Sequence, residues 1–125
     1  VLDWELSTLG HPLADLSNQC TGFYLNRQGP IKGLAGLNRK TEGIPTERDY
    51  VQRFEAKAKM GEIQNWPFYL AFNCFRFAAI AQGVLKRHLD GNASSASAEL
   101  VGALAKPVAT LGQTFITNPA NTTAN

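Results

Sequence analysis

Apolar residues recur at helical spacing near the start of the chain. A helix is predicted to begin at Pro12, because the fixed φ of proline suits the first helical position, and to end at Gly22. One face of this helix is apolar at i, i+3, i+7 and i+10, and its members are Leu13, Leu16, Cys20 and Phe23. These four side chains are therefore predicted to lie in the core.

A second amphipathic helix is predicted to follow Thr46. The Thr46 hydroxyl suits a helix N-cap, and Glu47 and Asp49 would lie in the first turn, where negative charge is favourable. The helix is predicted to stop at Gly61. Its apolar face comprises Tyr50, Val51, Phe54 and Ala58. The preceding residues 26–45 are rich in Gly, Asn, Lys and Arg and are predicted to form a long loop.

The longest predicted helix runs from Trp66 to Leu89, roughly 36 Å at 1.5 Å per residue. Its first half is apolar almost all round, which predicts burial on most sides. The segment is long enough to span a membrane, but polar and charged residues interrupt it at Asn73, Arg76, Gln82, Lys86 and Arg87. A charged residue at the bilayer centre costs about 2.5–3.5 kcal/mol. We therefore expect a buried helix of a soluble protein, with no membrane association.

A final helix is predicted from apolar positions at i, i+4, i+8, i+11 and i+15, which are Leu100, Leu104, Val108, Leu111 and Phe115. Pro107 should kink this helix or remove one backbone hydrogen bond. Residues 117–125 are predicted to form a flexible tail, and residues 1–4 a short strand. The predicted fold is mainly α: a helical bundle over residues 1–116 with one short strand at its start.

Composition narrows the classes of protein. The chain has 125 residues, enough for one domain, and its net charge of +2 (12 Lys+Arg against 10 Asp+Glu) does not suggest a nucleic-acid partner. Hydrophobic residues at 44% and charged residues at 18% argue against disorder. Cys20 and Cys74 are predicted to be buried thiols of a reducing compartment, so we expect a cytoplasmic location.

The most informative stretch for chemistry is residues 1–16. Asp3 and Glu5 follow an apolar pair, at the carboxyl end of the predicted strand. An acid in such a position faces a cleft in many folds, and carboxylate oxygens suit hard cations. Spacing alone leaves a solvated strand end open as the alternative.

The same stretch closely resembles the second catalytic motif of the aminoglycoside phosphotransferase and choline-kinase-like family. That motif reads as two apolar residues, D-W-E, a short spacer and G-[DH]-P-x-x-D-L, and here the residues are V-L-D-W-E, L-S-T-L and G-H-P-L-A-D-L. Residues 65–69, residues 79–84 and Arg87 are similar to the phosphotransferase-like domain associated with acyl-CoA dehydrogenase family members. The resemblance implies the helical C-terminal part of a protein-kinase-like (α+β) fold.

The resemblance also implies a role for each matching residue. Asp3 matches the metal-binding aspartate, whose carboxylate would hold Mg²⁺ against the phosphates of ATP, and Glu5 is a candidate for a second metal contact. Asp15 matches an acid that supports the catalytic loop by accepting backbone N–H bonds; the alternative is a solvated acid near a helix N-terminus. His11 stands where many members carry Asp, and we expect a cap or turn role for it.

The family's first motif, H-G-D-x-x-x-x-N, does not occur in residues 1–125. That motif supplies the catalytic base and a second metal ligand. The nucleotide-gripping lobe, with its lysine and glycine-rich loop, does not occur either. Phosphoryl transfer needs several such parts at once. We therefore expect a C-terminal fragment whose catalytic base lies upstream and which is inactive alone.

The predicted long helix offers a candidate substrate-binding wall. Asn73, Arg76 and Arg87 fall within roughly 60° of one another at 100° per residue. Arg76 could recognise an anionic group on the acceptor. The alternative for Arg76 is a structural ion pair with an acid, for which the candidates are Glu55, Glu62 and Asp90.

Three functions follow, of which the first is implied by the resemblance: an ATP-dependent phosphotransferase that phosphorylates a hydroxyl group of a small-molecule acceptor, with the subgroup pointing to a hydroxyacyl compound. The second is a non-catalytic helical module that binds a protein partner or forms a homodimer, through an apolar face left where the upstream lobe should sit. The third is a weak anion or nucleic-acid binder through the basic loop, which the net charge of +2 disfavours.

Overall fold

The computed structural model describes residues 9–29, 31–92 and 97–119, and these residues form a mainly helical fold, as predicted. The helices are α1 (Pro12–Thr21), α2 (Arg39–Glu42), α3 (Glu47–Ala58), α4 (Trp66–Leu89), α5 (Ala98–Gly102) and α6 (Ala105–Thr117). The described part holds no β-sheet, only an isolated parallel bridge between Asn26 and Ala35. The strand predicted at residues 1–4 lies outside the described residues.

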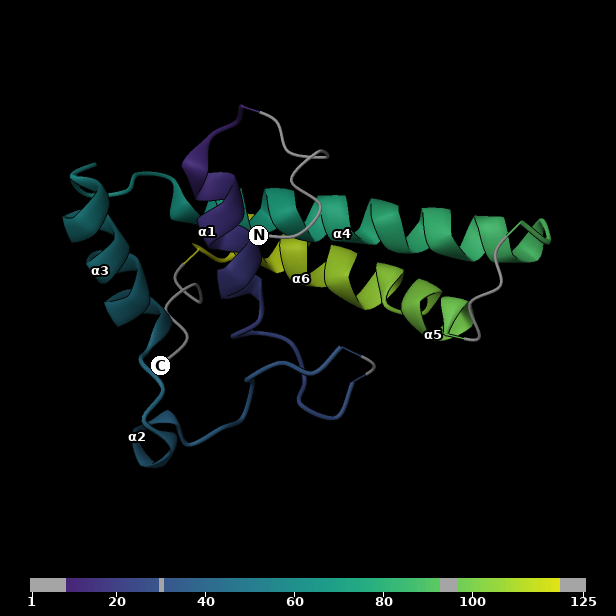
Figure 1. Ribbon diagram of the computed structural model, residues 1–125, viewed down its shortest axis with the longest axis horizontal. Coiled ribbons are helices and arrows are strands. Elements are labelled where there is room, and N and C mark those ends of the chain that lie inside the picture. Colours follow the sequence, from purple (N-terminus) through teal and green to yellow (C-terminus); the bar gives the residue numbers. More distant parts are fainter. Residues whose placement is uncertain (1–8, 30, 93–96, 120–125) are drawn as a thin grey trace.

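Helices α1, α5 and α6 all pack against α4, the longest helix of the fold (Figure 1). Helices α5 and α6 return along its length, and α1 crosses it near its N-terminal half. Helix α3 lies beside the start of α4, and the short α2 lies away from α4, on the long connection between α1 and α3. The contacts among the helices therefore gather on one side of α4.

The core lies where α1, α4 and α6 meet. The predicted apolar stripe of α1 is confirmed, because all four of its residues are buried: Leu13, Leu16, Cys20 and Phe23. Helix α4 contributes Leu70 and Cys74, and helix α6 contributes Val108 and Phe115. At Gly112 the helices α4 and α6 approach so closely that an added Cβ would lie 2.8 Å from the Cβ of Cys74.

The ends of α3 follow local chemistry. The predicted N-cap is confirmed: the Thr46 hydroxyl accepts a bond from the Asp49 N–H at 3.1 Å, and the Asp49 carboxylate accepts one from the Thr46 N–H at 3.4 Å, which together make a capping box. The helix ends earlier than predicted, because Lys59 takes a left-handed conformation (φ 54°) before Gly61 is reached. Ala58, assigned to the apolar face, is exposed in the last turn of α3.

The predicted final helix is two helices. Proline has no N–H, and its ring clashes with the carbonyl of the residue four positions earlier. For Pro107 that residue is Ala103, which lies at the break between α5 and α6. At this break the Leu104 N–H donates to the carbonyl three residues earlier, that of Val101, at 3.0 Å, which makes a tighter turn than an α-helix has. Leu100, a predicted core residue, is 59% exposed on the short helix before the break.

The bounds predicted for α4 are confirmed, but the prediction that its first half is buried on most sides is wrong. Phe68, Phe72 and Phe75 are 57%, 41% and 69% exposed. The other helices cover one side of α4 and leave these three rings on the open side. By length and composition α4 is apolar enough to cross a membrane, and 28% of that apolar window is buried within the fold.

Candidate functional site

The predicted metal ligands Asp3 and Glu5 lie outside the described residues. Within residues 9–29, 31–92 and 97–119, no group of three or more His, Cys, Asp or Glu side chains is placed to hold a metal ion. The magnesium site implied by the motif therefore depends on Asp3 itself, and its assignment stays a prediction.

The last part of the motif opens α1, and its histidine caps the helix. The Nδ1 atom of His11 accepts a hydrogen bond from the Leu13 N–H at 3.3 Å, and Pro12 occupies the first turn. The imidazole also stacks on the Tyr69 ring of α4, with 5.3 Å between ring centroids. The predicted cap role of His11 is thus confirmed. Asp15 is exposed, and no hydrogen bond from a described residue reaches it, so its support of a catalytic loop stays a prediction.

Asn73 fastens α4 to α1. Its side chain is buried, and its amide donates to the Ala14 carbonyl at 2.9 Å and to the Ser17 hydroxyl. Ser17 in turn donates to the Leu13 carbonyl at 2.6 Å. These bonds engage the amide nitrogen of Asn73 inside the fold, which gives this residue a structural role whatever its part in substrate binding.

Arg76 is exposed, and its guanidinium lies over the Phe72 ring at 5.8 Å from the centroid. The predicted alternative, an ion pair with an acid, is not found among the described residues. Asp90 instead pairs with Lys86 at 2.7 Å, and Glu55 accepts the Ile63 N–H at 2.7 Å. The only bond to a described residue is a long one, 3.5 Å, to the Asn73 amide oxygen. Arg76 could therefore meet an anion at the surface.

Arg87 lies too far along α4 to share a small ligand with Arg76. The two residues are 87 − 76 = 11 positions apart, which is about 16 Å along a helix axis. Arg87 is exposed and lies in the last turn of α4. One face of the helix therefore carries the three predicted residues, as the spacing required, but they do not converge on one point.

No pattern in the sequence indicates that Glu47 is a buried carboxylate at a junction of three segments. Its side chain is 1% exposed. One carboxylate oxygen accepts the Trp66 indole N–H at 3.1 Å, and the other accepts the Tyr24 hydroxyl. These bonds join α3, the start of α4 and the segment after α1. The partners stand 19 and 23 residues away, so no local pattern could reveal them.

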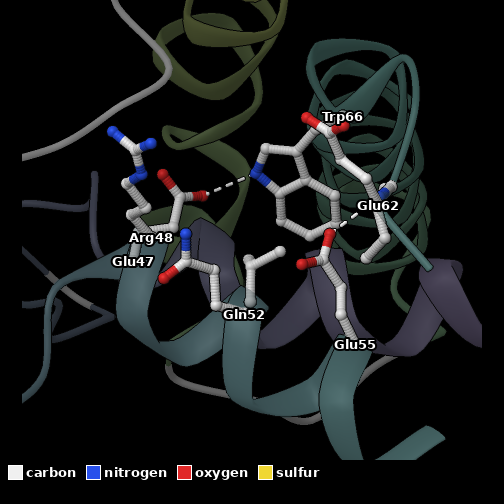
Figure 2. A pocket seen from close by; sticks show the side chains of 8 residues that line it. Glu47, Arg48, Gln52, Glu55, Glu62 and Trp66 are labelled. Atoms are coloured by element: carbon white, nitrogen blue, oxygen red, sulfur yellow. Dashed lines mark hydrogen bonds between the residues drawn. The ribbon is translucent and has the colours of Figure 1, made fainter. Parts of the chain in front are cut away.

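A cavity of about 260 Å³ opens beside this junction (Figure 2). The Trp66 indole forms one wall, Glu62 lies next to that ring, and Glu55 and Gln52 rise from α3 on the other side. The Glu47 carboxylate accepts the Trp66 indole N–H, and the Glu55 carboxylate accepts the Ile63 N–H. Two of the three carboxylates that line the cavity therefore hold the chain together, and the third, Glu62, is exposed at its rim.

The thiols of Cys20 and Cys74 are buried, as predicted, and burial raises the pKa of both. Desolvation, followed by the negative charge of Glu47, raises the pKa of Cys20 to about 12. Desolvation raises the pKa of Cys74 to about 11. Both thiols are therefore protonated at neutral pH, and the reactive thiolate form is disfavoured.

Known proteins similar to this chain are much longer. Acyl-CoA dehydrogenase family member 10 of mouse is 46% identical over 118 residues, which are 94% of this chain and 11% of the relative. Acyl-CoA dehydrogenase family member 11 of human is 37% identical over 113 residues, 90% of this chain and 14% of the relative. A probable acyl-CoA dehydrogenase of Arabidopsis thaliana, IBR3, is 37% identical over 100 residues, 76% of this chain and 12% of the relative.

The chain is thus homologous to one segment of proteins named acyl-CoA dehydrogenase family members, the subgroup that residues 65–69 and 79–84 resemble. It spans only 11% to 15% of the length of these relatives. No family model matches the chain, and no solved structure matches it.

Proposed function

We propose that this chain is the helical, C-terminal part of an ATP-dependent phosphotransferase domain that phosphorylates a hydroxyl group. The observation that carries the proposal is the motif of residues 1–16, with D-W-E followed by G-H-P-L-A-D-L. In this proposal Asp3 holds the Mg²⁺ that accompanies ATP, and bound magnesium would neutralise charge on the transferred phosphoryl group. Glu5 is the candidate for a second contact.

The described residues support the proposal through the anchoring of α1. Phosphoryl transfer depends on a rigidly placed metal ligand. The motif runs directly into α1, whose first turn is capped by His11 and stacked on Tyr69. One turn later Asn73 fastens the helix to α4. These contacts therefore hold the start of α1, where the motif joins the helix, in a fixed position relative to α4.

We propose a hydroxyacyl compound as the acceptor. The names of the relatives refer to acyl-CoA dehydrogenases, so those proteins are named for acyl substrates. The exposed Arg76 guanidinium would suit an anionic group on such an acceptor. A hydroxyl group on the acyl chain would accept the phosphoryl group of ATP.

The test uses the longer protein in which this segment occurs, with release of ADP measured in the presence of Mg²⁺ and a hydroxyacyl acceptor. Asp3→Asn should abolish acceptor-dependent ADP release and leave the circular dichroism spectrum unchanged. Glu62→Gln, an exposed acid on the cavity rim, is the matched control and should keep full turnover. Unchanged turnover in Asp3→Asn would remove Asp3 from the mechanism. The isolated chain should release no ADP.

A second candidate function is a non-catalytic helical module that binds a partner. The observation that favours it is the row of exposed phenylalanines on α4, Phe68, Phe72 and Phe75. Contiguous exposed apolar surface on a folded domain commonly marks an interaction site. An intact longer protein that binds its partners normally but never turns over ATP would favour this function over phosphoryl transfer.

A further inference from the structure

We propose that the segment after α1 borders a ligand-binding cleft that takes an unbranched apolar chain with an anionic head. The loop cleft, as we name it, consists of two neighbouring cavities beside residues 24–29 and 31–32. The larger cavity, of about 250 Å³, reaches α6, and the smaller one, of about 210 Å³, reaches α1 and α4. The identity of the chain as a phosphoryl acceptor rests on the proposed function, whereas the cleft and the class of its ligand do not.

The two cavities have the size and arrangement that an extended chain needs. They share Leu25 and Ile31 in their linings, so these two side chains stand between them. Each cavity exceeds the roughly 150 Å³ that holds benzene, and together they fall within the range of about 300–1,000 Å³ of ligand pockets. Ile31 is 37% exposed, and an exposed side chain changes rotamer rapidly. A chain can therefore pass from one cavity into the other when Ile31 turns.

The far walls of the loop cleft are apolar. Helix α6 and the residue before it supply four of these side chains to the larger cavity, and α4 supplies one to the smaller cavity. Removal of methylene groups from water into such surroundings is favourable. The five side chains are Leu104, Pro107, Val108, Leu111 and Phe77.

Backbone bonds hold the segment after α1 in place, so the cleft exists without a ligand. The Leu34 N–H donates to the Gly22 carbonyl at 2.8 Å, and the Ala35 N–H donates to the Leu25 carbonyl at 3.1 Å. Gly33 lies so close to the opposite strand of the loop that an added Cβ would lie 2.1 Å from the Leu25 carbonyl oxygen. A preformed site spares the ligand the free-energy cost of ordering a loop.

Lys32 determines the charge of the head. Among the described residues that line the two cavities, Lys32 alone is charged, and it forms no ion pair with another described residue. Asn18 and Gln19 line the same smaller cavity. The Gln19 amide oxygen accepts the Tyr50 hydroxyl, which leaves the Gln19 amide N–H groups as donors. An ammonium and amide donors favour a carboxylate or a phosphate, whereas a cationic head would meet a like charge.

Photolabelling of the longer protein, without ATP or magnesium, tests the proposal. Two probes carry a diazirine at the free end of the chain: dodecanoate and dodecyltrimethylammonium. With the head at Lys32, the free end should lie in the larger cavity, so peptide mapping should find the dodecanoate label on residues 104–111. Unlabelled dodecanoate and dodecyl phosphate should both displace it. The dodecyltrimethylammonium probe should label these residues at least about tenfold less.

Two variants with matched controls separate a ligand site from a structural role. Ile31→Trp fills the passage between the cavities and should lower the dodecanoate label at least about tenfold. Ile80→Trp, at a residue of α4 that is 59% exposed and outside the cleft, should label like the wild type. Lys32→Glu should reverse the preference between the two probes, and Lys40→Glu, on α2, should keep it.

Three results would overturn the proposal. The first is a wild type with no label on residues 104–111, or with equal label from both probes. The second is equal label in Ile31→Trp and the wild type, with both folded by circular dichroism. The third is an unchanged preference in Lys32→Glu. A wild type that is labelled but releases no ADP would refute the proposed function alone, and one that releases ADP without being labelled would refute the loop cleft alone.

Discussion

One glycine pair tests whether α4 and α6 pack as closely as the fold requires. Gly112 lies inside α6 and Gly83 inside α4, and neither has a positive φ. A Cβ on Gly112 would lie 2.8 Å from the Cβ of Cys74 and 3.4 Å from the Ala71 carbonyl oxygen. A Cβ on Gly83 would meet nothing within 4 Å. The same change to alanine therefore has opposite consequences at the two positions.

The magnitudes follow from two terms. Each glycine-to-alanine change in a helix interior gains about 1 kcal/mol of helix preference. Gly83→Ala receives this gain alone. At Gly112 the added methyl group meets a Cβ fixed to the backbone of α4, so the helices must separate, and overpacking of this kind costs about 1–3 kcal/mol. The free energy of unfolding of Gly112→Ala should therefore fall below that of Gly83→Ala by about 1–3 kcal/mol.

Urea unfolding followed by circular dichroism measures this difference. With a slope of about 1.5 kcal/mol per molar urea, the two midpoints should differ by roughly 0.7–2 M. The double variant Cys74→Gly with Gly112→Ala removes the opposing Cβ, so it should show a favourable coupling energy in a double-mutant cycle. Equal midpoints for Gly83→Ala and Gly112→Ala would refute the close approach of α4 and α6.

Three further predictions concern the buried polar groups. Glu47→Ala removes the carboxylate that accepts the Tyr24 hydroxyl and the Trp66 indole N–H. The free energy of unfolding, measured in urea, should therefore fall by about 3 kcal/mol, well beyond the effect of Glu62→Ala at the surface. Asn73→Ala should lower the free energy of unfolding by about 1–3 kcal/mol and with it the thermal midpoint, whereas Arg76→Ala should change the free energy of unfolding by less than about 0.5 kcal/mol. The reverse order would contradict the assignment of Asn73 as the residue that joins α1 to α4. Burial raises the pKa of the Cys20 thiol from 9.0 to about 12 and that of the Cys74 thiol from 9.0 to about 11, so above pH 9 the folded chain keeps protons that the unfolded chain releases. The free energy of unfolding should therefore be unaffected by these thiols below pH 9 and should decline between pH 9 and pH 11–12. The double variant Cys20→Ala with Cys74→Ala should lose less stability over this window, and an identical decline would count against the burial of the thiols.

The extent to which the sequence predicts the fold depends on how local the cause is. The bounds of α1 and α4 and the start of α3 follow from local signals: Pro12 at a helix start, the Thr46 capping box and a continuous helical segment after Asn65. The break in the last helix is also local, since Pro107 displaces the bond to Ala103. For the candidate site, the cap at His11 follows from its place before Pro12. The motif at residues 1–16 supports an assignment for Asp3 and nothing about its surroundings.

Only the tertiary structure decided which faces are covered and which distant groups meet. The first half of α4 is apolar all round, so its composition cannot say which side stays open; that choice is made by where α1 and α6 pack, and it leaves Phe68 and Phe75 exposed. The burial of Glu47 depends on donors far away in the chain, and no sequence spacing encodes them. Helix boundaries are set by neighbouring residues through backbone hydrogen bonds, whereas burial is set by contacts between segments, which exist only once the chain has folded.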